Sequence, residues 1–417
     1  MFPDPQTEAT MQSTFEEDVD GLTQWAHSAW RGTPAEMPGG MRLYSPGEQR
    51  ENEQRMESSL KYAPPSFDEY RKLSGEQRSH FSLQVLRAMT GSGCGSGLNG
   101  RMKYLEQCDA VTERFVSEAK RFDAGLSGEE IHQALRNLWV FESILEYLGL
   151  PIVFTPSSFA YSLLYPYADN WLDAPERSKD EKLGLVQWLS KWFDNPGCAP
   201  VNEITGTVGR LLAMIREEFP VAEYPGVYGS LLAIHNAQRD SLVVQANEAE
   251  IDDLSLERHT IRKGGTSVLA DGFLAAGSLE KEASLATFGY GVVLQLIDDL
   301  QDLEEDGRAG HSTPFLRFRD TGEIEKEARK LLAYSSNVSA LIEAKKPDLG
   351  RLIADSSTLL ALTAVCRNAH SFSRGFVESI QPLMPIRPAF LREMKVRISS
   401  SPYGQQNRIP WRGIRAA

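Results

Sequence analysis

The stretch Leu285-Ala-Thr-Phe-Gly-Tyr-Gly-Val-Val-Leu-Gln-Leu-Ile-Asp-Asp-Leu-Gln-Asp-Leu-Glu-Glu-Asp306 begins as an apolar helix and ends in a run of carboxylates. Asp298, Asp302 and Asp306 are spaced four residues apart, which predicts that they share one face of a helix. Like charges at this spacing destabilise a helix unless a cation lies between them. Because no His or Cys is near, the oxygen ligands favour a hard ion such as Mg²⁺.

An acidic run at a helix end is more often a solvated surface than a binding site. The residues before this run argue against that interpretation, because apolar side chains cover most sides of the helix and predict its burial. These residues are Val292, Val293, Leu294, Leu296 and Ile297. Carboxylates that continue a buried helix are expected at the mouth of a cavity. We therefore favour a metal site that includes Asp298, Asp299, Asp302 and Asp306.

A second acidic pair, Asp169 and Asp173, ends another apolar helix, which is expected over residues 157–171 with a kink or break at Pro166. Two acids four residues apart are common, so this pair alone is a weak signal. It gains weight because it repeats the arrangement of Asp298 and Asp302. Two such pairs on two helices can face each other across a bundle, bind magnesium ions between them and, through the ions, bind a diphosphate.

Cationic side chains are expected to complete a diphosphate site, and Lys263 is the best candidate. It lies in an otherwise apolar helix and is followed by Gly264 and Gly265, which allow a bulky ligand or a neighbouring helix to approach closely. The alternative for Lys263 is an ordinary surface lysine. Arg262, Arg239 and Arg308 are weaker candidates for the same role, because each is more simply explained as a surface charge.

The composition of the 417 residues, with 41% hydrophobic and 24% charged, is that of a soluble globular protein. The net charge of −13 argues against nucleic acid as a partner. The four cysteines are scattered without CxxC spacing, which favours reduced thiols in a cytoplasmic protein. No signal peptide and no transmembrane segment are expected, since no apolar run approaches the ~20 residues that a membrane span needs.

The rest of the chain predicts an all-α fold, with no convincing strand alternation. A single large helical bundle is expected over residues 61–385, after a flexible polar arm at 1–60 and before a basic tail at 386–417. Within the bundle, a capping box predicts a helix that begins at Ser66, and the glycine-rich segment 91–97 is expected to be a linker. Further helices are expected at 101–122, 128–148, 182–193, 203–219, 227–246, 254–277, 325–344 and 349–377.

These motifs together resemble the class I isoprenoid synthases, which include trans-prenyltransferases and class I terpene synthases. The likeness covers about residues 157–315. Gln295-Leu-Ile-Asp298-Asp299-Leu-Gln-Asp302 is similar to the second aspartate-rich motif of prenyltransferases, and Lys263 with Thr266 is similar to the lysine–threonine pair that precedes it. Asp169-Asn-Trp-Leu-Asp173 resembles the first aspartate-rich motif, with Asn170 in place of its second aspartate. Gly310-His-Ser-Thr-Pro-Phe-Leu316 resembles the family's following loop and helix start.

Departures from the family pattern distinguish the subfamilies. Chain-elongating prenyltransferases carry an early Gly-Gly-Lys-Arg stretch and an Arg-Arg-Gly after the first motif, which together bind isopentenyl diphosphate. Neither is present here, where Arg177 stands alone. The resemblance therefore implies a terpene synthase that acts on one allylic polyprenyl diphosphate. A chain-elongating polyprenyl diphosphate synthase is the first alternative, and a non-catalytic helical partner subunit is the second, supported by Asn170.

For a terpene synthase, the resemblance implies that several Mg²⁺ ions bridge the substrate diphosphate to Asp169, Asp173, Asp298 and Asp302, and that Lys263 and an arginine add positive charge. Ionisation would produce a carbocation in a dry cavity, where aromatic faces stabilise it. The aromatic residues on the motif-bearing helices are Phe159, Tyr161, Tyr165, Phe288 and Tyr290, which are candidates to line this cavity or to belong to the core. A homodimer is expected from the family likeness alone.

Overall fold

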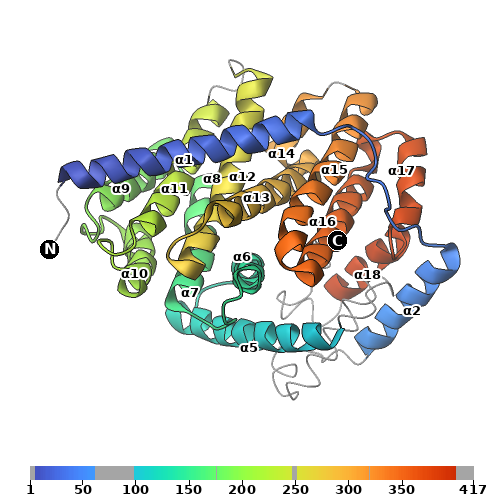
Figure 1. Cartoon of the computed structure of the whole chain (residues 1–417), viewed down its shortest axis with the longest axis horizontal. Coiled ribbons are helices and arrows are strands. Elements are labelled where there is room, and N and C mark those ends of the chain that lie inside the picture. The colour runs from blue at the N-terminus through green and yellow to red at the C-terminus, as the bar shows by residue number, and fades with distance from the viewer. Residues whose placement is uncertain (1–4, 62–97, 175, 247–250, 319, 401–417) are drawn as a thin grey trace. The chain divides into compact units, whose positions relative to one another are not determined.

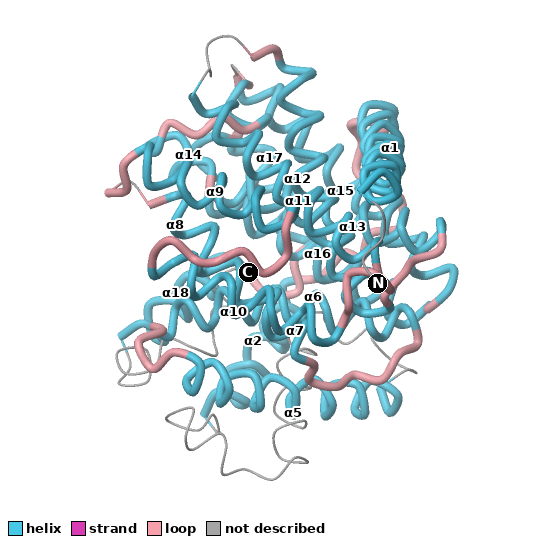
Figure 2. Tube along the Cα trace, turned by 90° about the vertical axis from the view of Figure 1, so that its left-hand side faces the viewer, coloured by secondary structure: helices cyan, strands magenta, loops and turns pink. Residues whose placement is uncertain are grey.

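The computed structural model describes residues 5–61, 98–174, 176–246, 251–318 and 320–400 of the chain. Over these ranges, all regular elements are helices and no residue is in a strand (Figure 2). The all-α class expected from the sequence is therefore confirmed for this part of the chain. The helix expected from Ser66 and the linker expected at 91–97 lie outside the described residues.

The chain divides into two compact units that are interleaved in sequence. Unit 1 consists of Met1–Gly32, Gln133–Gln295 and Gly310–Pro314, and unit 2 consists of Thr33–His132, Leu296–Ala309 and Phe315–Ala417. Two of the boundaries pass through long helices, α6 (Gly128–Leu148) and α13 (Lys281–Gln301). The apolar pattern of both helices runs across these points without a break, so the sequence shows no sign of the division.

Unit 1 is built around helices that follow one another closely in the chain. Besides its parts of α6 and α13, it contains α1 (Pro5–Gly32), α7 (Pro156–Leu164), the π-helix η1 (Tyr165–Asp169), α8 (Asn170–Asp173), α9 (Lys179–Asp194), α10 (Glu203–Glu218), α11 (Pro225–Ala246) and α12 (Asp253–Ala276). Helix α11 packs on α9 and α12, and α7 packs on α10. Capping boxes start three of these helices, because Thr155, Ser178 and Asn202 each accept a bond from the backbone N–H three residues on.

The N-terminal segment forms a 28-residue helix, α1, where a loosely ordered arm was expected. It lies along α11 and α12 (Figure 1). Its buried residues recur at helical spacing and form one narrow stripe: Val19, Thr23, Ala26 and Trp30. The ring of Phe15 lies 5.2 Å from that of Phe273 in α12. The high polar content of the segment conceals this stripe, because the other faces of the helix carry most of its residues.

Helices α12 and α13 cross in close contact through glycines. A Cβ atom placed on Gly291 would lie 2.1 Å from the carbonyl oxygen of Gly264, and one placed on Gly265 would lie 2.3 Å from the ring of Phe288. Both approaches are far shorter than a van der Waals contact, so larger residues would force the helices apart. The glycines that follow Lys263 therefore admit a neighbouring helix, which was one of the two roles expected for them.

Unit 2 contains α2 (Pro46–Lys61), α5 (Leu98–Phe122), α14 (Leu303–Ala309), α15 (Thr321–Lys345), α16 (Pro347–Arg367), α17 (Arg374–Ile380) and α18 (Pro388–Ser400), with short 3₁₀ turns at Pro314–Arg317, Ala369–Ser371 and Gln381–Leu383. Helices α15 and α16 form an antiparallel hairpin across Lys346. Arg387 pairs with the buried Glu53 of α2 at 2.5 Å, so the start of the expected basic tail is held by an ion pair. Residues 401–417 of that tail lie outside the described residues.

Helix α16 is long and apolar enough to cross a membrane by length and composition, although no such segment was expected from the sequence. Of its most apolar window, 56% is buried within the protein. A buried core helix passes the same test, so this single helix is weak support for a membrane span.

Candidate metal and diphosphate site

Three aspartates at the end of α13 and the start of α14 keep one helical register. The amide of Asp302 donates to the carbonyl of Asp298 at 3.0 Å, and the amide of Asp306 donates to the carbonyl of Asp302 at 2.8 Å. The i→i−4 bonding therefore continues across the bend at Asp302 that separates the two helices. The helix before them is buried as expected, with Val292, Val293, Leu296 and Ile297 each at most 3% exposed.

Burial and the neighbouring carboxylates of this cluster raise the cost of ionising Asp302. The pKa of Asp302 is raised to about 6, first by burial and then by the charge of Asp298, with smaller contributions from Glu305 and Asp306. Asp299, beside them, is only 5% exposed. Concentrated negative charge at a partly buried helix end would be relieved by a bound cation. The donor set is oxygen only, which fits Mg²⁺.

Two residues at the end of α16 hold the acidic end of α13, and the sequence did not identify either. Arg367 lies 3.1 Å from Asp302 and 3.8 Å from Glu305. The side-chain amide of Asn368 donates to the carbonyls of Leu300 and Gln301 at 2.8 and 3.1 Å. These bonds satisfy carbonyls that a helix C-terminus leaves unpaired. No local pattern could have revealed the pairing, because 65 residues separate Asp302 from Arg367.

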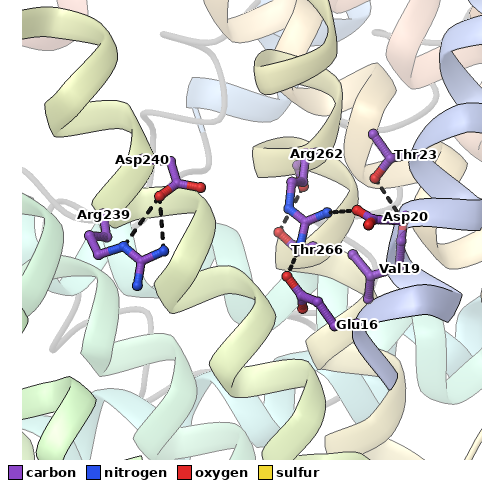
Figure 3. A network of polar contacts seen from close by, with 8 residues as sticks. All are labelled: Glu16, Val19, Asp20, Thr23, Arg239, Asp240, Arg262 and Thr266. Atoms are coloured by element: carbon purple, nitrogen blue, oxygen red, sulfur yellow. Dashed lines mark hydrogen bonds and ion pairs between the residues drawn. The ribbon is translucent and has the colours of Figure 1, made fainter. Parts of the chain in front are cut away.

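The arginines expected to bind diphosphate all contact carboxylates of the protein. Arg262 in α12 pairs with Glu16 and with Asp20 of α1, the latter at 2.5 Å (Figure 3). Arg239 lies 3.1 Å from its neighbour Asp240 (Figure 3). Arg308 pairs with Glu304 one turn away, and its side chain is 74% exposed. The contacts of Arg262 join α1 to α12, whereas those of Arg239 and Arg308 are local surface pairs.

Lys263 follows Arg262 on α12 and is half-buried. Among the described residues, no carboxylate forms an ion pair with it. Its charge helps to lower the pKa of His259 to about 4, after burial as the main cause. Thr266 is fully buried, and its hydroxyl donates to the carbonyls of Arg262 and Lys263 at 2.8 and 3.1 Å. The threonine hydroxyl is therefore bonded within its own helix.

The first acidic motif begins where α7 widens into the π-helix Tyr165–Asp169. Pro166 cannot donate a backbone hydrogen bond to the preceding turn, so the break expected at this residue takes the form of one wider turn. Asp169 closes the π-helix and accepts a bond from the side chain of Gln238 at 2.5 Å. Asp173 ends α8, and its side chain lies outside the described part of the chain.

Asn170, which stands where the family motif has an aspartate, forms a reciprocal amide pair with Gln133. Gln133 donates to Asn170 at 2.9 Å, and Asn170 donates back at 2.8 Å. A carboxylate could accept the first bond but could not donate the second. Asn170 therefore makes a neutral contact between η1–α8 and α6.

Asp169 and Lys263 belong to unit 1, whereas Asp298, Asp299, Asp302 and Asp306 belong to unit 2. Over the described ranges, no group of three or more His, Cys, Asp or Glu side chains is placed to hold a metal ion by itself. Mg²⁺ usually keeps several waters and is bound through one or two carboxylates together with substrate phosphates.

The five aromatic candidates fall into different environments. Phe159 and Phe288 are core residues, 2% and 0% exposed, and Tyr165 is 38% exposed. Tyr161 is nearly buried and donates to the carbonyl of Ser267 at 2.8 Å. Burial raises the pKa of Tyr161 well above its usual value and that of Tyr290 to about 12.

The charge of Asp271 contributes to the pKa shift of both Tyr161 and Tyr290, so all three lie near one another in unit 1. The sequence did not identify Asp271, because a lone acid in an apolar helix carries no spacing signal.

No family model matches the chain, and no curated protein or solved structure matches it.

Proposed function

We propose that this protein is a magnesium-dependent class I terpene synthase, which ionises one linear polyprenyl diphosphate and cyclises the carbocation or eliminates a proton from it. The observation that carries the proposal is the shared register of Asp298, Asp302 and Asp306 at the end of a buried helix. A solvated acidic surface would not raise the pKa of Asp302 to about 6 by burial. Crowded oxygen ligands of this kind are suited to divalent ions.

In this proposal, Asp298 and Asp302 would hold metal ions in unit 2, and Asp169 and Asp173 of the first motif are the candidate ligands in unit 1. Bound Mg²⁺ supplies Lewis-acid stabilisation to the departing diphosphate. Lys263 would add a positive charge to a diphosphate bound in unit 1. Arg262 is excluded from this role as long as Glu16 and Asp20 neutralise it.

The surroundings of Arg177 favour a reaction with one substrate over chain elongation. This arginine is the isolated counterpart of the family's Arg-Arg-Gly stretch. Its guanidinium lies 3.8 Å from the centre of the Trp171 ring and 3.1 Å from Glu181. It is therefore committed to contacts within the protein, and a second diphosphate would have to displace them. Chain elongation with isopentenyl diphosphate remains the alternative within the same family.

A non-catalytic helical subunit is the second alternative, and the neutral Asn170–Gln133 pair favours it. Thermal unfolding with Mg²⁺ and inorganic pyrophosphate separates it from the enzyme proposals. A synthase should gain stability from the two ligands together and much less from either alone, because ion and phosphate bind as one unit. Absence of this joint effect would favour the non-catalytic role.

A further inference from the structure

The N-terminal helix α1 places two of its acids on Arg262, the cation next to Lys263 on α12. Arg262 pairs with Glu16 and with Asp20, the latter at 2.5 Å (Figure 3). The two acids are four residues apart, so they lie on one face of α1. The Arg262 side chain is only 14% exposed, whereas those of Glu16 and Asp20 are 40% and 62% exposed. The carboxylates therefore lie on the solvent side of the guanidinium group.

Other contacts hold α1 on unit 1 independently of this pair of acids. Besides the buried stripe of α1, the ring of Phe15 lies so close to α11 that a Cβ atom placed on Gly229 would be 2.6 Å from it. Farther along α1, His27 and Arg31 lie 3.2 and 3.3 Å from Glu257 of α12. Ion pairs near the surface contribute little to stability. The two acids can therefore leave Arg262 while α1 stays in place.

Arg262 and Lys263 act on the same place on α12. His259 lies three residues before Arg262 and four before Lys263, which makes it a neighbour of both on the helix surface. Burial is the main cause of the low pKa of His259, and the charges of Lys263 and Arg262 lower it further. The imidazole is hydrogen-bonded to Ser241 of α11 at 2.7 Å. An anion bound at Lys263 would therefore lie near Arg262, whose charge is at present taken up by α1.

We infer that Glu16 and Asp20 form an autoinhibitory contact, in which they compete with a diphosphate for Arg262 and so weaken its binding beside Lys263. The class of this ligand rests on the proposed function. The guanidinium fork suits carboxylate and phosphate oxygens equally well, so a diphosphate can replace the carboxylates as the acceptor of its N–H groups. While the acids remain in place, the anion meets one uncompensated cation and is repelled by two nearby negative charges.

The contact acts on every diphosphate that reaches this side of α12. It weakens the binding of a prenyl diphosphate, and it equally weakens the binding of the pyrophosphate that the proposed reaction releases. Release of product limits the turnover of many enzymes. An internal competitor for Arg262 would therefore favour the departure of pyrophosphate at the expense of a higher KM for the substrate.

Binding of inorganic pyrophosphate, measured by isothermal titration calorimetry, tests the contact. The double variant Glu16→Gln/Asp20→Asn should bind pyrophosphate about 10-fold more tightly than wild type, the value of hydrogen bonds to a charged group. Adding Arg262→Gln should return the affinity to the wild-type level, because the freed cation is lost again. The matched control Glu17→Gln/Asp18→Asn removes the same two charges from exposed positions of α1. It should bind like wild type, since salt screens exposed charges.

The outcomes separate this inference from the function on which it rests. If Glu16→Gln/Asp20→Asn binds pyrophosphate no more tightly than its control, or if the gain survives Arg262→Gln, the autoinhibitory contact is wrong and the synthase proposal stands. No binding by any of the proteins would also overturn the contact. If the gain is found but wild type makes no product from any prenyl diphosphate, the contact is supported and the synthase proposal is overturned.

A smaller change covers the case in which the double variant does not fold. Asp20→Asn alone alters the more exposed of the two acids, and Asp18→Asn is its matched control. Far-UV circular dichroism and thermal unfolding check that both single variants keep the wild-type fold. Asp20→Asn should still bind pyrophosphate more tightly than Asp18→Asn, and equal affinities would contradict the autoinhibitory contact.

Discussion

Arg367 at the end of α16 lies 3.1 Å from Asp302, the central acid of the α13–α14 cluster. Its charge opposes the rise in the pKa of Asp302 that burial and Asp298 cause. The cluster is therefore partly neutralised by the protein itself. In the proposed enzyme, Arg367 lowers the repulsion that must otherwise be relieved by metal ions, and it fixes the orientation of a metal ligand.

Replacing Arg367 by glutamine should make the protein depend more on Mg²⁺. Without the ion, we expect a loss of at most about 1 kcal/mol in the free energy of unfolding, because both side chains are partly exposed. The stabilisation produced by Mg²⁺ in a thermal unfolding assay should exceed that of wild type, since more negative charge remains to be neutralised. Arg351→Gln, which breaks a surface pair with Asp348, is the control. Equal Mg²⁺ stabilisation in wild type and Arg367→Gln would contradict this account.

Lys263 and Arg262 are adjacent on α12 and should give opposite results when each is changed to glutamine. Lys263→Gln should lower kcat/KM by about 10- to 100-fold, the value of a hydrogen bond to a charged group, with little change in stability. Arg262→Gln should destabilise unit 1 by about 1 kcal/mol through loss of the pairs with Glu16 and Asp20. Its kcat/KM should stay within a few-fold of wild type. Steady-state kinetics and urea unfolding of both variants measure the two effects, and a reversed pattern would mean that Arg262 is the diphosphate ligand.

His235 makes the stability of unit 1 sensitive to acid. Burial lowers its pKa to about 4, and its ring lies 2.9 Å from the hydroxyl of Ser190. In the unfolded state this histidine binds a proton near pH 6.5, whereas in the folded state it does not. The contribution of the neutral ring to the free energy of unfolding is therefore fully present above that pH. It is lost as the pH falls from about 6.5 to about 4. The full effect is on the order of 3 kcal/mol.

Urea unfolding of wild type and His235→Gln over this pH range measures the contribution. The difference in unfolding free energy between the two should shrink as the pH falls, because glutamine does not titrate. His370→Gln, which changes an exposed histidine, should parallel wild type. A constant difference between wild type and His235→Gln across the range would show that His235 does not titrate in this way.

Local signals explain which features were predictable. The helix at Gly128–Leu148 was expected within the same bounds because its apolar stripe is wide and Gly149 stops it. The register of Asp298 and Asp302 follows from spacing alone. The helix α1 was missed because its buried stripe is only one residue wide per turn. Asp271 and Arg367 were missed because their roles depend on residues far apart in the chain, which no periodicity records.

The direct test of the central claim is product analysis by gas chromatography with purified protein, Mg²⁺ and farnesyl or geranylgeranyl diphosphate, with and without isopentenyl diphosphate. The account predicts a hydrocarbon or alcohol product without isopentenyl diphosphate, and metal chelation should abolish its formation. Asp302→Asn should reduce product formation more than about 100-fold, which exceeds the usual loss of activity when a residue that only supports a metal ligand is changed. Asp348→Asn should retain full activity. A longer diphosphate formed only with isopentenyl diphosphate, or no product under any condition, would contradict the account.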